Sequence, residues 1–445
     1  MSLKEGINFW HENGEKYIPE PSLRENINAD FLVIGGGFSG LSTAFNLKLQ
    51  SPEAKVVLLE SEFIGFGASG RNTGFCVAKF GLDMPTIKML YGRERAIEAH
   101  HFSEQALDYI HYMVKKYNMQ SEFRACGFLQ VACSDSRRKK LLSTIETYEA
   151  MGLNGGNWLE QSKVQENIHS SLFKGGLFHE KSALLHPLKH IREWKRLCLQ
   201  QGVDIYEFSP VQHICHQSQV ITNTPYGQVQ SKKLVIATNA YMHLIKGLEG
   251  HQRKQTPLWA YIIATEPLSD EQWQAIGWQN REGLQDNRNF LHAIRPSEDG
   301  RLIMTGNMPG LSFGQMMNRD NNPKVWQALK DNLAAFFPVL KQLKVTYAWG
   351  GAISVTMDMA PSIGYLGDER ILYSTGCFGH GVASSQFNGR LLSELALEKE
   401  TALTNFWIVN RQPLAWPFEP LRYLMKKSIV KFMSLEDRLK ENRIR

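Results

Sequence analysis

Residues 30–60 read DFLVIGGGFSGLSTAFNLKLQSPEAKVVLLE, and this stretch decides the fold of the chain. The run before the glycines is short, apolar and partly β-branched, which is typical of a buried strand in a parallel sheet. Gly35, Gly37 and Gly40 fit the pattern G-x-G-x-x-G, and apolar residues then recur at helical spacing. A second apolar strand follows and ends at Glu60. The order of strand, glycine loop, helix and strand predicts a βαβ unit that binds a dinucleotide.

Each residue of this motif has a physical role. Gly35 permits the tight turn out of the strand, Gly37 lets a pyrophosphate approach the backbone, and Gly40 lets the helix pack closely on the sheet. The N–H groups at the helix start then face the phosphate charges. The Glu60 carboxylate can accept hydrogen bonds from ribose hydroxyls and would repel the 2′-phosphate of NADP. The alternative is a glycine turn in another kind of α/β protein, which the presence of both strands, the helix and the acid disfavours.

Length and composition set the broad class. A chain of 445 residues is too long for one simple core and suggests two domains. With 43% hydrophobic and 21% charged residues it has the composition of a soluble globular enzyme. A net charge of +6 does not by itself imply a nucleic acid partner, and we expect none.

Cysteine usage and hydropathy predict a cytoplasmic protein. The six cysteines include no C-x-x-C pair, which argues against a zinc site or a disulfide framework, and we expect no bound metal. No apolar run approaches the roughly 20 residues that a membrane span needs. The N-terminus also lacks the apolar segment of a signal peptide.

The rest of the chain predicts a second domain interleaved with the first. Alternating strand patterns at 259–265, 290–294 and 302–305, with a helix near 325–337, indicate a mainly antiparallel sheet. The predicted fold class is α/β, or α+β overall, with a Rossmann-type nucleotide-binding domain and a discontinuous substrate domain. In chain order we expect a leader at 1–29, the nucleotide-binding domain at 30–84, 184–240 and 346–412, the substrate domain at 85–183 and 241–345, and a C-terminal amphipathic tail at 413–445.

Two more glycine-rich segments indicate where a planar ligand would lie. Residues 65–74 read GFGASGRNTG, and small residues at this density allow a flat ring to approach the backbone. Arg71 adds a charge that can meet a phosphate or a ring edge, although the segment could also be a plain flexible loop. Residues 370–376 predict a strand that runs into the glycine turn 377–381 and a helix. The N–H groups at this second helix start could stabilise negative charge on a reduced ring.

Four motifs together resemble a known family. They are the Gly35 fingerprint, Gly-Ala-Ser-Gly-Arg-Asn at 67–72, Leu-His-Pro at 185–187 and Gly-His-Gly at 379–381. They resemble the FAD-dependent oxidases of the D-amino-acid oxidase and glycine/sarcosine oxidase superfamily. The loop at 67–72 is most similar to the γ-glutamylputrescine oxidase-like branch. The resemblance extends over nearly the whole chain.

The resemblance implies a two-domain flavoprotein with tightly held FAD. Adenine and ribose would lie near Glu60 and Val211, the pyrophosphate on residues 35–40, and the flavin between residues 67–72 and 376–381. The cofactor contacts that it implies are Gly35, Gly37, Phe38, Ser39, Gly40, Glu60, Ser61, Gly67, Ala68, Ser69, Arg71, Asn72, Val211, Thr238, Gly351, Gly376, Gly379, His380, Gly381 and Val382. The family reaction oxidises a C–N bond: a neutral amine loses hydride to flavin N5, the imine is hydrolysed, and O₂ reoxidises the flavin to give peroxide.

Two departures from the family pattern carry information. In glycine and D-amino-acid oxidases, the segment matching 349–353 ends in an arginine that holds the substrate carboxylate, and here that position is Ile353. An apolar residue cannot form a bidentate carboxylate contact, so an amine without an α-carboxylate is favoured unless another base such as Arg295 takes over. The flavin-linking cysteine of monomeric sarcosine oxidases aligns near Gly351, which predicts non-covalent FAD. Cys377 is the alternative linker, although a small buried thiol is the commoner role.

A few residues are candidates for catalysis. His380, in a glycine turn at a helix start, should be neutral and could exchange a hydrogen bond near the flavin, or could merely bond the backbone. Trp349 and Tyr261 could form apolar walls beside the flavin, or could belong to the core. Lys79 could assist O₂ reduction, or could be a solvated surface residue. No general base stands out, and hydride transfer from a neutral amine need not use one.

The C-terminal tail combines apolar and basic residues at helical spacing. Its apolar residues near one face are Leu421, Leu424, Met425, Phe432, Leu435 and Leu439, and its interleaved cations are Arg422, Lys426, Lys427, Lys431, Arg438 and Lys440. Such a helix could lie on an anionic membrane surface. The alternative that we favour is a helix packed by its apolar face on its own protein, because relatives in the family carry a similar tail.

The leading hypothesis is therefore an FAD-dependent amine oxidase that uses a small amine, such as a γ-glutamylated polyamine, and O₂. One rival is a flavin dehydrogenase that passes electrons to a quinone or carrier. Another is a non-catalytic flavoprotein or surface-binding module that uses the basic tail. A nicotinamide dehydrogenase is the weakest alternative, because the second glycine turn has no obvious role there. The sequence does not determine the oligomeric state.

Overall fold

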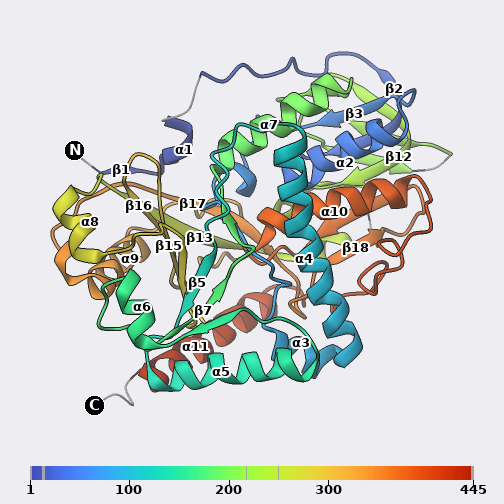
Figure 1. Ribbon diagram of the computed structural model, residues 1–445. Coiled ribbons are helices and arrows are strands. Elements are labelled where there is room, and N and C mark those ends of the chain that lie inside the picture. Colours follow the sequence, from blue (N-terminus) through green and yellow to red (C-terminus); the bar gives the residue numbers. More distant parts are fainter. Residues whose placement is uncertain (1–2, 13–15, 217, 249, 442–445) are drawn as a thin grey trace.

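The chain forms two large sheets, which lie side by side in Figure 1. The structure is a computed structural model that describes residues 3–12, 16–216, 218–248 and 250–441. The first sheet contains the predicted βαβ unit, and the second is the predicted, mainly antiparallel sheet. The mixed α/β fold class is confirmed.

The first sheet is built from parallel strands in the order β9–β3–β2–β12–β19. At its edges, β18 is antiparallel to β19, and β10 and β11 continue antiparallel from β12. Its strands are β2 (Ile27–Ile34), β3 (Val56–Leu59), β9 (Asp204–Tyr206), β10 (His213–His216), β11 (Val220–Asn223), β12 (Gln228–Ile236), β18 (Ser362–Tyr365) and β19 (Ile371–Thr375). Both faces of the central strands are packed, which explains why β3 is apolar throughout.

Three helices cover one face of this sheet: α2 (Phe38–Gln50), α7 (Pro187–Gln200) and α10 (Gly381–Ala396). The helices α2 and α10 pack closely, and a β-carbon at Gly389 would lie only 2.6 Å from the Ser39 carbonyl oxygen. The first turn of α2 therefore lies against the middle of α10. Phe38 of α2 and Gly381 of α10 line one cavity, so both predicted glycine turns meet at the same edge of the sheet.

The second sheet has nine strands in the order β1–β17–β13–β16–β15–β14–β5–β7–β6. They are β1 (Lys4–Glu5), β5 (Phe128–Val131), β6 (Asn157–Leu159), β7 (Gly176–His179), β13 (Thr256–Thr265), β14 (Gly283–Asp286), β15 (His292–Pro296), β16 (Leu302–Gly306) and β17 (Val345–Val355). The strand patterns at 259–265, 290–294 and 302–305 correspond to β13, β15 and β16. The predicted helix near 325–337 is α9 (Pro323–Phe336).

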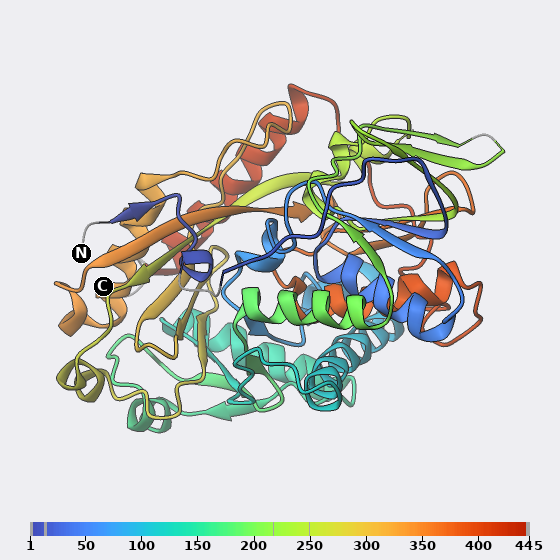
Figure 2. The ribbon, with the colours of Figure 1, turned by 90° about the horizontal axis from the view of Figure 1, so that it is seen from above.

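Strand β17 differs from the predicted domain division. The sequence analysis placed residues from 346 onward in the nucleotide-binding domain, whereas β17 pairs with β13 along its whole length in the second sheet. These two long strands extend from the second sheet to the glycine turns of the first domain (Figure 2). The second sheet therefore supplies one wall of the space in front of the glycine turns.

The remaining elements connect or cover the sheets. A two-stranded sheet pairs β4 (Phe75–Cys76) with β8 (Ala183–Leu184). The other helices are α1 (Phe9–Glu12), α3 (Met84–Tyr91), α4 (Arg93–Lys116), α5 (Asp135–Ala150), α6 (Gln161–Asn167), α8 (Asp270–Ile276) and α11 (Leu421–Glu441), with 3₁₀ turns at Ala68–Gly70, Asn239–Leu244, His251–Arg253 and Pro338–Leu340. None of the described helices has the length and apolar content that a membrane crossing requires.

The N-terminal leader is integrated into the protein. Phe9 and Trp10 are buried in the main core. The Trp10 indole Nε1 donates to the Asn72 carbonyl at 2.9 Å, and the Asn8 amide donates to the Gly70 carbonyl at 2.9 Å. The leader therefore supports the glycine-rich loop at 67–72 through hydrogen bonds to its backbone carbonyls.

A buried ion pair fastens the next part of the leader. Glu207 is fully buried and accepts from Lys195 Nζ at 2.8 Å and from the Tyr17 hydroxyl at 2.6 Å. It also accepts from the backbone N–H groups of Glu20 and Ile64, each at 2.6 Å. One carboxylate thus joins the leader, α7 and the segment after β3, and its charge is balanced where it is buried.

We expect Glu207→Gln to lower the free energy of unfolding by about 3 kcal/mol, because it leaves the buried Lys195 without its main counter-charge and turns an amide toward donors. The exposed Glu62→Gln provides a matched control and should stay within about 0.5 kcal/mol. Urea unfolding followed by circular dichroism measures both. Equal stability of the two variants would contradict the role given to Glu207.

Candidate active site

Most of the predicted cofactor residues line two adjoining cavities at the carboxyl ends of the parallel strands. The first has a volume of about 240 Å³ and the second about 120 Å³. Ala68, Ser69 and Asn239 line both, so the two cavities form one elongated site. The predicted residues that line the first are Gly35, Gly37, Glu60, Ser61, Gly67, Ala68, Ser69, Val211 and Thr238. Those that line the second are Phe38, Ala68, Ser69, Arg71, Asn72, Gly351, Gly379, Gly381 and Val382.

The three fingerprint glycines have the environments that their roles require. Gly35 has a φ of +109°, and Gly40 is so close to the sheet that a β-carbon there would lie 1.9 Å from the Gly35 oxygen. Gly37 differs, because the only atoms that its β-carbon would meet are those of the Ser69 side chain, with Oγ at 3.0 Å. Gly37 therefore opens onto the first cavity, whereas Gly35 and Gly40 shape the turn.

Unpartnered polar atoms remain at the start of α2. Ser39 Oγ and Thr238 Oγ1 are buried and have no hydrogen-bond partner among the described residues. The N-cap residue of α2, Gly37, has no side chain to cap the helix, and Ser69 Oγ accepts from the Phe38 N–H at 3.0 Å. Buried donors without partners are rare in folded proteins, and the N-terminus of a helix attracts anions. The residues present therefore fit a diphosphate at this position.

Glu60 lines the first cavity and anchors the glycine loop. Its carboxylate accepts from the Gly36 N–H at 2.6 Å, from the Ser61 hydroxyl at 3.1 Å and from the Glu62 N–H at 3.0 Å. Burial raises the pKa of Glu60, while these hydrogen bonds act in the opposite direction. The predicted ribose contact remains a prediction, but the carboxylate is placed at the cavity where that contact would be made.

The wall of the second cavity comes from alternate residues of β13 and β17. Ala260 and Ile262 of β13 and Gly351 and Ile353 of β17 line it, because successive side chains of a strand point to opposite faces. The Tyr261 side chain points to the opposite face of the sheet, where its hydroxyl donates to the Arg319 carbonyl at 2.8 Å. The structure therefore does not bring Tyr261 to the cavity as an apolar wall.

Trp349 also does not line either cavity. It is buried, and its indole Nε1 donates to the Arg71 carbonyl at 2.9 Å. It supports the loop at 67–72 from β17, opposite the support that Trp10 gives from the leader. Its position agrees with the core alternative considered for it, one layer away from the cavity surface.

Arg71 and Asn72 line the second cavity but are largely occupied by the protein. Arg71 donates to the carbonyls of Phe66 at 2.7 Å and Gly350 at 3.1 Å, and it forms an ion pair with Asp320 at 3.3 Å. The Asn72 side chain bonds the backbone of its own loop at Ala68, Ser69 and Gly74. Both residues shape the loop, and their predicted flavin contacts remain predictions.

His380 is the N-cap residue of α10, between two glycines that line the second cavity. Its Nδ1 atom is buried and has no partner among the described residues. Burial, helped by the charge of Lys79, lowers the pKa of His380 to about 3, so the ring is neutral at pH 7 as predicted. His380 itself does not line either cavity, and neither do Ser39, Gly40 and Gly376.

Lys79 is half-buried behind the same turn and is not a solvated surface residue. Its ammonium lies 3.4 Å from Gln285 Oε1 and 5.4 Å from the centre of the Phe128 ring. Burial lowers the pKa of Lys79 to about 8. The role in O₂ reduction considered for Lys79 remains a prediction.

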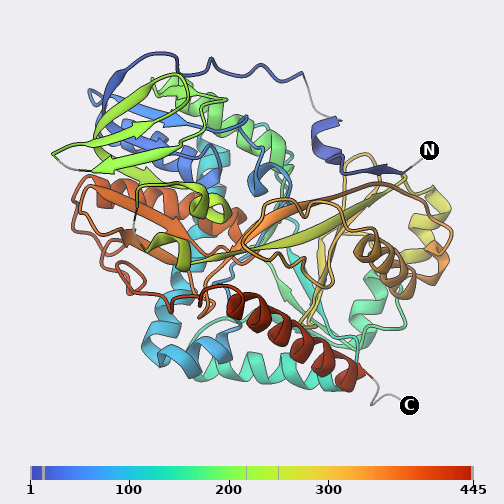
Figure 3. The ribbon, with the colours of Figure 1, turned by 180° about the vertical axis from the view of Figure 1, so that it is seen from behind.

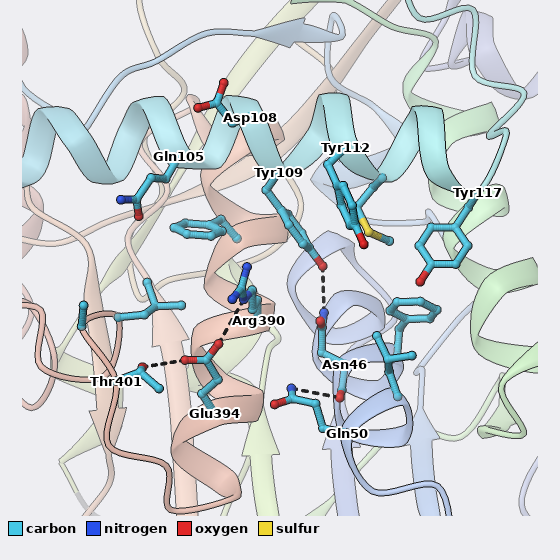
Figure 4. A pocket seen from close by; sticks show the side chains of 16 residues that line it. Asn46, Gln50, Gln105, Asp108, Tyr109, Tyr112, Tyr117, Arg390, Glu394 and Thr401 are labelled. Carbon is cyan, nitrogen blue, oxygen red and sulfur yellow. Dashed lines mark hydrogen bonds and ion pairs between the residues drawn. The ribbon is translucent and has the colours of Figure 1, made fainter.

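A larger cavity lies elsewhere. It has a volume of about 760 Å³ and is formed by α2, α4 and α10 on the helical side of the first sheet. Figure 4 shows three side-chain pairs in it: Tyr109 with Asn46 at 2.8 Å, and Glu394 with Arg390 at 3.0 Å and with Thr401 at 2.7 Å. It contains no predicted site residue, so size alone does not indicate the active site here.

The comparisons with known proteins agree with the site geometry. The sequence model of the family described as "DAO: FAD dependent oxidoreductase" matches residues 30–395. The chain belongs to this family. It is therefore an FAD-dependent oxidoreductase, as the resemblance implied.

Curated relatives and solved structures show which members of the family the chain is similar to. The chain is 32% identical over 389 residues to γ-glutamylputrescine oxidoreductase of Escherichia coli, covering 87% of this chain and 88% of that protein. It is 30% identical over 390 residues to "Probable oxidoreductase OrdL" of Haemophilus influenzae, covering 87% of each. Glycine oxidase from Geobacillus kaustophilus has the same fold, with a TM-score of 0.72 at 17% identity over 86% of this chain and 99% of that one.

Sequence reasoning missed Asn239. It follows β12, has a φ of +46°, lines both cavities, and donates from its amide to Cys377 Sγ at 3.1 Å. It thus ties the end of one central strand to the second glycine turn. Its signal in the sequence was a polar residue after a buried apolar strand, since the carboxyl ends of parallel strands form the ligand edge of such sheets.

We expect Gly37→Val to abolish flavin retention without unfolding the chain. Gly37 has φ −86° and ψ −178°, which valine adopts readily, and the added side chain would occupy the first cavity. The flavin-to-protein ratio after purification should fall to about a tenth of the wild-type value or less. Gly40→Val is the matched comparison, because it clashes with backbone and should lower the stability of the apoprotein itself. Retention of flavin by Gly37→Val would contradict the diphosphate position.

The lowered pKa of Lys79 predicts a pH-dependent stability. Between pH 8 and 10.5 the unfolded chain binds a proton at this lysine that the folded chain does not, since its pKa falls from 10.5 to about 8 on folding. The stability of the wild type relative to Lys79→Met should therefore rise with pH through this window and level off below it. Urea unfolding of both proteins across pH 7–10.5 measures the difference, and a flat difference would show that Lys79 is solvated.

Proposed function

We propose that this flavoenzyme oxidises the C–N bond of a small amine that carries no carboxylate on the reacting carbon, in particular a γ-glutamylated polyamine, with O₂ as the electron acceptor. The similarity to γ-glutamylputrescine oxidoreductase over most of both chains supports this substrate class. FAD, when bound, supplies the two-electron redox chemistry, and the protein supplies binding, orientation and electrostatics.

The observation that carries the proposal is the chemistry of the second cavity. Ile353 lies on its wall, and Arg71 is the one charged residue among the described residues that line it. Because Arg71 already binds two carbonyls and Asp320, it offers no free bidentate edge to a substrate carboxylate.

Arg295 does not replace the missing arginine. It donates to the carbonyls of Leu185 at 2.6 Å and Pro296 at 2.9 Å, and its guanidinium lies 5.7 Å from the centre of the Trp10 ring. Burial lowers the pKa of Arg295 to about 10. Its donors hold the strand and loop behind the site, so a carboxylate at the reacting carbon would lack a partner.

The remaining residues suit a neutral amine. Ala260, Ile262 and Ile353 give the cavity an apolar wall, which disfavours an ammonium and favours the uncharged form that can release hydride. The His380 ring, neutral at pH 7, keeps one nitrogen available beside the second glycine turn. The apolar side chains orient the substrate and keep water away, and none of the residues that line the cavity has to act as a strong base.

An anaerobic substrate panel tests the function. γ-Glutamylputrescine should bleach the flavin absorbance, putrescine should do so more slowly, and glycine, sarcosine and D-alanine should not. Admission of air should restore the absorbance and release peroxide. Bleaching by the amino acids alone would contradict the substrate class. A reduced flavin that is stable in air but reoxidised by a soluble quinone would contradict O₂ as the acceptor.

Substitutions at Ile353 sharpen the test. Ile353→Arg places a cation in the apolar wall and should lower kcat/KM for the amine at least about 10-fold, whereas Ile353→Leu keeps the volume and should stay within about 3-fold. The absorbance of bound flavin, measured in both variants, separates an effect on the substrate from a loss of cofactor. Equal loss in both variants would show that Ile353 acts through packing alone.

A further inference from the structure

The C-terminal helix α11 is docked with its polar side inward. Arg422, Lys426 and Asp437 are all buried against the protein. The Asp437 carboxylate binds Arg137 of α5 and accepts from the N–H groups of Asn289 and Phe290, each at 3.0 Å. This orientation is opposite to the packing that the sequence analysis favoured, in which the apolar face lies on the protein.

The other anchors of α11 are polar as well. Lys426 Nζ donates to the Ser312 carbonyl at 2.9 Å, and Arg422 donates to the Pro417 carbonyl at 2.9 Å. Burial lowers the pKa of Lys426 to about 8. Near the other end, Glu436 accepts from the Asn289 amide at 2.8 Å. The helix is held along its length by hydrogen bonds and ion pairs, so its orientation does not depend on apolar contacts.

The outward side of α11 is an apolar stripe. Its large side chains are each between 55% and 68% exposed and recur at helical spacing: Leu421, Leu424, Phe432, Leu435 and Leu439. Figure 3 shows the helix lying along the outside of the molecule with no other described element over this side. A water-soluble helix normally hides such a stripe, and a contiguous exposed apolar surface marks an interaction site.

A row of cations borders the stripe on one side. Lys427, Lys431 and Arg438 are exposed, follow one another at helical spacing, and form no ion pair with the described residues. The acids of α11 are elsewhere: Asp437 is buried, and Glu436 and Glu441 bind Lys440 and Arg288. Within the described part of this helix, both acids that reach solvent are therefore paired with a cation, and Lys427, Lys431 and Arg438 are the exposed charges without an ion pair.

We propose that α11 binds the surface of an anionic membrane. An apolar stripe bordered by cations suits the boundary between acyl chains and negatively charged headgroups, into which such helices insert their apolar face by roughly 5–10 Å. A second copy of the chain fits less well, because the two acids of α11 that reach solvent are already paired and would not meet the cations of its partner. The proposal concerns a surface remote from the flavin site and does not depend on the substrate class.

Vesicle sedimentation of the full-length holoenzyme tests the proposal. The protein should sediment with vesicles of phosphatidylcholine and phosphatidylglycerol at low salt, and much less with vesicles of phosphatidylcholine alone or in high salt. The triple change Lys427→Glu, Lys431→Glu and Arg438→Glu should weaken binding roughly 100-fold, because each basic residue near an anionic surface contributes about a five-fold factor.

A second variant and a matched control separate the contributions. Leu424→Ser, Phe432→Ser and Leu435→Ser together should weaken binding at least about 10-fold while keeping the flavin absorbance, since the replaced side chains face outward. The same charge change at the exposed residues Lys324, Lys341 and Lys344, far from α11 in the sequence, should leave sedimentation close to the wild-type level.

Three outcomes would overturn the proposal. One is the absence of wild-type binding to anionic vesicles. The second is equal loss of binding in the Lys324, Lys341 and Lys344 control, which would show a nonspecific charge effect. The third is a concentration-dependent dimer, seen by analytical ultracentrifugation, that the serine variant dissolves, which would show that the stripe joins two copies of the chain.

Discussion

The close approach of the Gly40 backbone to the Gly35 carbonyl is the constraint on which the site depends. A β-carbon at Gly40 would lie 1.9 Å from that oxygen, so only glycine lets α2 begin directly against the end of β2. The start of α2 thus lies at the cavity, where the Ser39 and Thr238 hydroxyl oxygens have no partner among the described residues. The same edge carries the start of α10, since Phe38 of α2 and Gly381 of α10 line one cavity. The predicted diphosphate position and the second glycine turn thus share one edge of the sheet.

Support for the second cavity comes from distant parts of the chain. Trp10 of the leader and Trp349 of β17 donate to successive carbonyls of the loop at 67–72, at Asn72 and Arg71. Arg71 in turn binds the Gly350 carbonyl. The loop is therefore held by hydrogen bonds from the leader and from β17 although it is rich in glycine, which favours a structural role over a plain flexible loop. Such support from residues outside the cavity is what holds a binding site in one geometry.

The sequence predicted well those features that depend on the spacing of neighbouring residues. The βαβ unit, the second glycine turn and the strands near residues 259–265 each follow from short-range spacing, and the structure confirms them. The face of β13 that lines the cavity was harder to predict. Alternation identifies the two faces of a strand but not which of them meets the ligand, so it did not distinguish Tyr261 from Ile262. The burial of Lys79 and the depth of Trp10 depend on tertiary packing and leave no local signal.

The orientation of α11 shows the same limit and has a wider consequence. Helical periodicity separates an apolar face from a polar one, but it does not say which of them meets the protein, and in this chain the ion pair of Arg137 with Asp437 decides it. The net charge of +6 likewise does not by itself indicate what the protein binds. Its meaning depends on position: Lys195 is balanced by Glu207 and Arg71 by Asp320, whereas Lys427, Lys431 and Arg438 face outward beside an apolar stripe. A modestly basic chain thus presents a concentrated cationic edge at one place, and its partner is indicated by that edge and not by the total charge.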